Sequence, residues 1–112
     1  MDGKVTIHHL LSRKGRQKWV QLHVDSGAEA EAAAEAGIVI LSCEPDHTLE
    51  PIRAAAPLAF VSAGMPHGQV SSPQEAIRAG FDILRRGADA VYCSHSPHFI
   101  EAMAREGIPV TG

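Results

Sequence analysis

The chain has 112 residues, of which 45% are hydrophobic, and a formal charge of -3 at pH 7. This length predicts a single domain over residues 1–112, whereas a closed (β/α) barrel usually needs about 200 residues or more, and the charge gives no reason to expect nucleic acid or an anionic membrane as partner. The first residues lack the apolar run of a signal peptide or membrane span and the two cysteines suit a reducing compartment, so we expect a cytoplasmic protein.

Apolar periodicity and turn residues predict helices and strands that alternate along the chain. A short amphipathic helix is expected over residues 5–11, with its end at Gly15. Ser26, Ser72 and Ser96 each precede a helical pattern and can accept a hydrogen bond from an orphan backbone N–H. The expected strands cover residues 19–24, 38–41, 58–61, 89–93 and 108–110, and the expected helices between them cover residues 28–36, 47–55, 73–86 and 97–106.

The strand pattern indicates a parallel sheet. The strands are short apolar runs without alternation, which is typical of parallel strands covered on both faces. The sequence helix, glycine, buried strand recurs at Gly37, Gly87 and Gly107, and the chain ends within a repeat. We therefore predict an α/β fold of parallel (β/α) repeats, a partial TIM (β/α)8-type barrel with about four to five strands, whose ligand site lies past the carboxyl ends of the strands.

Several motifs occur in an order that is more specific than any one of them. They are Val24-Asp25 before a helix ending in Glu35-Ala36-Gly37, the loop Ala63-Gly64-Met65-Pro66-His67-Gly68, the helix start Ser72-Pro73-Gln74-Glu75-Ala76, the strand Gly87-Ala88-Asp89-Ala90-Val91, and Gly107-Ile108-Pro109-Val110 with Gly112. In this order they resemble the N-terminal half of the ketopantoate hydroxymethyltransferase family, which belongs to the phosphoenolpyruvate mutase/isocitrate lyase superfamily.

The resemblance implies a (β/α)8 barrel that transfers a hydroxymethyl group from 5,10-methylenetetrahydrofolate to a 2-oxo acid bound on Mg²⁺, a step of pantothenate biosynthesis. The chain departs from the family where the chemistry lies. Cys43-Glu44-Pro45 replaces Gly-Asp-Ser, Gly64 stands at the second acidic position, and Tyr92-Cys93-Ser94 replaces Lys-Leu-Glu. Glu44 is then the candidate metal ligand, helped by Asp25 or Asp46, and the catalytic residues stay unassigned because the family's base lies beyond Gly112.

The candidate substrate-binding residues are Asp25, His67, Ser94 and His95, all at predicted carboxyl ends of strands. Asp25 either contacts the substrate or caps the helix that follows it. His67 replaces the family's Phe, so it either lines a more polar pocket or points to solvent.

Two further patterns have alternative interpretations. Cys93-x-His95-x-x-His98 offers softer donors that suit zinc, although the spacing is not a recognised zinc signature. Cys43 is either a nucleophile or a buried small hydrophobe, and no base beside it is visible in the sequence. Arg85 and Arg86 close a helix and are expected only to complement its dipole.

Three functions follow as hypotheses: a divergent or partial hydroxymethyltransferase acting on a small 2-oxo acid, a non-catalytic half-barrel that serves as an assembly module, or another lyase of the superfamily acting on a small carboxylate. Four or five parallel strands leave two open edges and an uncovered apolar face. We therefore expect either a homo-oligomer that completes the sheet or the front part of a longer polypeptide.

Overall fold

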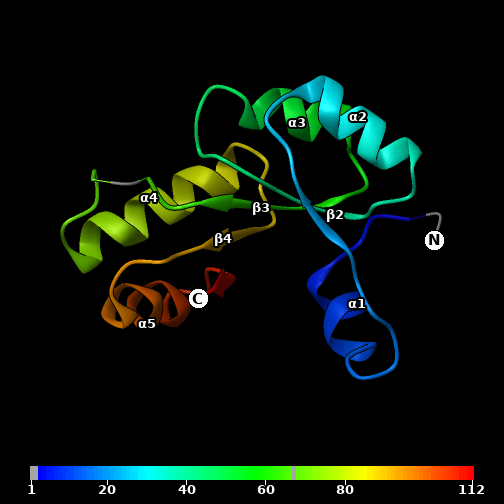
Figure 1. The fold of residues 1–112 in the computed structure, drawn as a ribbon. Coiled ribbons are helices and arrows are strands. Elements are labelled where there is room, and N and C mark those ends of the chain that lie inside the picture. The colour runs from blue at the N-terminus through cyan, green and yellow to red at the C-terminus, as the bar shows by residue number, and fades with distance from the viewer. Residues whose placement is uncertain (1–2, 67) are drawn as a thin grey trace.

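The computed structural model describes residues 3–66 and 68–112, in which strands and helices alternate (Figure 1). The strands are β1 (Gln21–His23), β2 (Ile40–Cys43), β3 (Phe60–Gly64), β4 (Ala90–Tyr92) and β5 (Val110–Thr111). The helices are α1 (Ile7–Ser12), α2 (Gly27–Glu35), α3 (Leu49–Ala55), α4 (Pro73–Arg85) and α5 (Pro97–Arg105). None of these helices is long and apolar enough to span a bilayer.

The sheet has the strand order β1-β2-β3-β4-β5, and every neighbouring pair is parallel. Each strand therefore lies beside the strand that follows it in the sequence, as in one part of a (β/α) barrel. The predicted α/β fold with parallel (β/α) repeats is confirmed.

The strands begin later than predicted, and the helix ends explain the shift. The backbone N–H of Ile38 donates to the carbonyl of Ala33, and the N–H of Ile108 donates to the carbonyl of Met103. These bonds run across a glycine with positive φ and belong to the C-terminal cap of the preceding helix. The residue after the glycine is therefore held by its helix and cannot yet join the sheet.

The predicted serine caps are all present. The Oγ atoms of Ser26 and Ser72 accept hydrogen bonds from the backbone N–H three residues later, at 3.1 and 3.2 Å. Ser96 Oγ accepts from the N–H of His98 at 3.2 Å. Proline follows both Ser72 and Ser96 in the first turn, where its missing N–H costs little.

The two faces of the sheet differ in what covers them. The larger hydrophobic cluster lies between the sheet and helices α2 to α5, and includes strand residues such as Leu41 and Val61. The neighbouring residues Ile40 and Phe60 point to the opposite face and pack with Val5 in a smaller cluster. Figure 1 shows α1 on the other side of the sheet from α2 and α3. We call the side of α2 to α5 the covered face, and the side of α1 the open face.

A polar network at the amino ends of the strands is centred on Asp89. Its Oδ2 atom accepts hydrogen bonds from Lys4 Nζ and Arg53 Nη1, both at 2.8 Å. The same oxygen accepts from the backbone N–H of Val61 at 2.9 Å. Lys4 and Arg53 also donate to the carbonyl of Ala59, at 2.9 and 2.7 Å. The network thus joins the N-terminal segment and α3 to the starts of β3 and β4.

Replacing Asp89 with Asn is expected to lower the free energy of unfolding by about 3 kcal/mol, because two partly buried cations lose their counter-charge. Urea denaturation followed by circular dichroism measures this change. The matched control is Glu101→Gln, which removes an exposed ion pair with Arg105 and should cost about 0.5 kcal/mol or less. Equal losses for the two variants would contradict a special role for Asp89.

Candidate functional site

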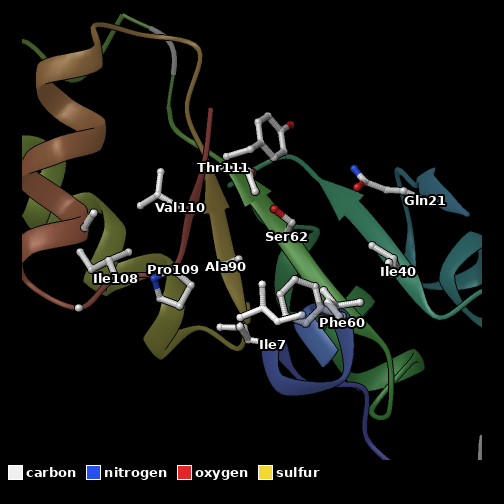
Figure 2. Close-up of a pocket in the computed structure, with 15 residues that line it drawn as sticks. Ile7, Gln21, Ile40, Phe60, Ser62, Ala90, Ile108, Pro109, Val110 and Thr111 are labelled. Atoms are coloured by element: carbon white, nitrogen blue, oxygen red, sulfur yellow. The ribbon is translucent and has the colours of Figure 1, made fainter. Parts of the chain in front are cut away.

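A pocket of about 510 Å³ lies on the open face of the sheet. Figure 2 shows Ile7 of α1 beside Phe60 of β3 at one end of this pocket, with Ile40 of β2 nearby. Ser62 and Thr111 lie nearer the carboxyl ends of their strands and bring hydroxyl groups to the pocket. The pocket is thus apolar toward α1 and more polar toward the end of the sheet where α/β proteins bind ligands.

Four polar residues at the ends of β1 and β2 form what we call the rim cluster: His23, Asp25, Ser42 and Glu44. His23 Nδ1 lies 3.1 Å from Ser42 Oγ, and the two residues are directly paired in the sheet. His23 Nε2 lies 3.4 Å from Asp25 Oδ1 and 3.8 Å from Glu44 Oε1. One imidazole therefore connects a buried hydroxyl to two solvent-exposed carboxylates.

Tyr92 lies at the carboxyl ends of the strands and reaches from β4 toward β2. Its phenol O–H donates to the carbonyl of Cys43 at 3.3 Å. A Cβ atom added to Gly64 would lie 2.6 Å from the Tyr92 ring, which is far too close. Burial raises the pKa of Tyr92, with a further contribution from the Glu44 carboxylate, so the phenol stays protonated and can donate. Glycine at position 64 thus leaves free the volume that the Tyr92 ring occupies.

The structure brings together two of the predicted site residues and leaves one undescribed. Asp25 and Glu44 both contact the imidazole of His23. The prediction for His67 lies outside the described residues. Ser94 and His95 follow β4, where His95 Nδ1 lies 3.9 Å from the sulfur of Cys93.

The alternative in which Asp25 caps the following helix is wrong. Ser26 caps α2, and the backbone N–H of Asp25 donates to Glu29 Oε1 at 2.6 Å. The Asp25 carboxylate is free of the helix end and faces His23 instead.

Sequence reasoning missed His23 and one of the roles of Arg86. His23 is the last residue of β1 and stands two positions before Asp25. Side chains two positions apart in an extended chain point to the same face, so this spacing could have predicted that His23 and Asp25 lie close together. Arg86 donates to Glu50 Oε1 at 2.9 Å and to the carbonyls of Pro45 and Asp46. Its expected role as a helix-dipole partner alone is therefore wrong, because it also anchors the loop that follows Glu44.

Cys43 is a buried small hydrophobe in the covered-face cluster. Burial raises the pKa of its thiol to about 11, and the nearby carboxylates of Asp46 and Glu44 add to the effect. The thiolate that a nucleophile needs is scarce at neutral pH, so the structure favours the packing interpretation over the catalytic one.

Few side chains in the described part of the chain are placed to bind a metal ion. Among residues 3–66 and 68–112, no group of three or more His, Cys, Asp or Glu side chains is arranged to hold a metal ion. The finding includes Cys93, His95 and His98, so the described structure does not support their interpretation as a zinc site. At the rim, Asp25 and Glu44 offer carboxylate oxygens, but they do not make a complete shell for a cation, so Glu44 as metal ligand stays a prediction.

The chain matches no model of a known protein family, and it has no match among curated proteins. The resemblance to the ketopantoate hydroxymethyltransferase family therefore depends on the order of the sequence motifs alone.

The fit between Gly64 and Tyr92 can be tested with a double-mutant cycle. Gly64→Ala is expected to lower the free energy of unfolding by about 1–3 kcal/mol, because the new methyl group collides with the ring. The same change in a Tyr92→Ala background should cost much less, since the ring is gone. Denaturation of the four proteins measures the coupling, and equal costs in both backgrounds would contradict it. Gly3→Ala, where the added atom meets nothing within 4 Å, is the control.

Proposed function

We propose that the chain is a divergent, partial relative of ketopantoate hydroxymethyltransferase that binds a small 2-oxo acid at the rim cluster, with weakly held Mg²⁺ and 5,10-methylenetetrahydrofolate as co-substrate. The protein is proposed to act in the cytoplasm and as a homo-oligomer. The observation that carries the proposal is the joining of Asp25 and Glu44 through His23 at the carboxyl ends of sequential parallel strands. Catalytic sites of (β/α) barrels lie at this end.

The shape of the pocket supports an acid with an apolar side chain. Ile7, Ile40 and Phe60 offer an apolar end for a branched side chain, and Ser62 offers a hydroxyl nearer the rim. The ligand's carboxylate and ketone would then lie toward the rim cluster at the carboxyl ends of the strands.

The charge of the rim supports a cation as part of the complex. Asp25 and Glu44 carry two negative charges there, and a 2-oxo acid adds a third. Both carboxylates lie near the same imidazole nitrogen, so their charges and that of the acid repel one another. A divalent cation that neutralises them would help the acid to bind. With two protein carboxylates, water must supply most of the Mg²⁺ shell, which supports weak rather than tight binding.

Hydroxymethyl transfer needs a base that removes a proton from the carbon next to the ketone. Histidine is the side chain that enzymes most often use as a general base, and His23 is the histidine of the rim cluster. We include it in the proposal as the proton acceptor, with Ser42 holding its other nitrogen.

The second candidate is a non-catalytic half-barrel that serves as an assembly module. The open face of the sheet favours it, because its pocket is lined mainly by apolar side chains. The replacement of the family's acidic and lysine positions by Gly64 and Tyr92 favours it as well.

An activity assay separates the two candidates. The purified chain is mixed with 3-methyl-2-oxobutanoate, 5,10-methylenetetrahydrofolate and Mg²⁺, and formation of the hydroxymethylated acid is followed by mass spectrometry. Turnover is expected, and His23→Asn should lower it by at least tenfold. Glu31→Gln on the exposed surface of α2 should leave it unchanged. A folded chain without any turnover would exclude the enzyme and favour the assembly module.

Metal binding is tested by calorimetry. Mg²⁺ should bind with a dissociation constant of roughly 1 mM or weaker, because the protein offers an incomplete set of oxygens. Glu44→Gln should weaken binding severalfold, whereas Glu31→Gln should not change it. Tight binding that survives Glu44→Gln would show that Glu44 is not the ligand and would direct attention to Asp25 or Asp46.

A further inference from the structure

We infer that two copies of this chain close a single barrel around a two-fold axis parallel to the strands, with β5 of each copy beside β1 of the other. The inference rests on the homo-oligomer of the proposed function and adds its geometry. It assigns each sheet edge a specific partner, the opposite edge of a second copy.

The order of the strands determines which edges can meet. In the described part of the chain, β1 pairs with β2 alone and β5 pairs with β4 alone, so each has one side without a strand. All strands point the same way. A two-fold axis along the strand direction keeps the strands of both copies parallel. It brings β5 of each copy beside β1 of the other, so the two junctions together leave no open edge. Pairing β1 with β1 around a perpendicular axis would be antiparallel and would leave both β5 edges open.

The exposed surface is large for the mass of the chain. The accessible surface is 6510 Å², whereas a folded monomer of 11.9 kDa exposes about 6,000 Å² by the usual scaling. The excess of roughly 500 Å² is smaller than the area of about 800 Å² per partner that a standard interface buries, and it is surface that a second copy could cover. Large apolar side chains contribute to it at the β1 edge and in α1: Leu22 is 41% exposed, and Val20 and Leu11 are each 66% exposed.

Side-chain direction matches across the two edges. Leu22 pairs with Leu41, a member of the covered-face cluster, so Leu22 points to the covered face. Val110 pairs with Val91, which belongs to the same cluster. Neighbouring residues of parallel strands point to one face, so Leu22 of one copy and Val110 of the other can pack together without turning either strand over.

The charges beside the edges are complementary. Arg16 and Lys18 lie just before β1, and Glu106 lies before β5, next to Arg105, whose charge is paired with Glu101. Parallel pairing of the two strands brings these amino ends together, so opposite charges meet at each of the two junctions. The same closure places the two open faces opposite one another and encloses their apolar pockets.

Cross-linking between two variants that each carry one added cysteine tests the arrangement. Leu22→Cys is prepared in one batch and Val110→Cys in another, and each is treated with a short bis-maleimide alone and after mixing. The closed dimer predicts a covalent dimer in the mixture, while each variant alone stays uncross-linked. The native Cys43 and Cys93 are 0% and 2% exposed, so the unaltered chain, treated in parallel, should give no product.

Two results would overturn the inference. Cross-linking of Leu22→Cys with itself would show that like edges meet, and a monomer of the unaltered chain by light scattering at high concentration would show that the edges find no second copy. Glu106→Lys should weaken the dimer at least severalfold, whereas Glu31→Lys on α2 should not. None of these measurements depends on turnover, so a failure of the dimer and a failure of the enzyme proposal are distinguishable.

Discussion

The carboxylate of Asp89 is the contact on which the positions of the other elements depend. One oxygen receives hydrogen bonds from Lys4, Arg53 and the backbone of Val61, and so it ties together parts of the chain that are up to 85 residues apart. Burying these charges is costly unless each is paired, and here the cations also find backbone carbonyls. The starts of β3 and β4 are thereby held together, and their carboxyl ends follow in register.

The sheet is covered unequally, and this decides where a ligand or a partner can bind. Because helices α2 to α5 pack on one face, the residues that alternate to the other face pack with the N-terminal segment, at Val5, Leu10 of α1 and Trp19. Ile40 and Phe60 are buried there and line the pocket, together with Ser62 nearer the carboxyl ends. The open face thus offers both the proposed pocket for a small acid and the proposed surface for a second copy.

Two departures from the resembled family are coupled in space. Gly64 on β3 and Tyr92 on β4 are 28 residues apart in the numbering, but the ring of one occupies the volume that a side chain on the other would need. Once Tyr92 reaches the carbonyl of Cys43, an acidic residue at position 64 has no room. The remaining carboxylates, Asp25 and Glu44, lie on the β1 and β2 side of the sheet, so the proposed ligand site is shifted toward that side.

The sequence by itself determined the helix starts at Ser26, Ser72 and Ser96 and the parallel α/β class, because caps involve residues two or three positions apart and the strand pattern is local. The tertiary structure alone decided the rest. His23 meets Glu44 because β1 and β2 pair in one register, and Arg86 holds the loop after Glu44 because α4 ends beside α3. Such contacts join residues 21 to 41 positions apart, and no local propensity specifies them. They form only when the packed sheet has brought its strand ends to a common edge.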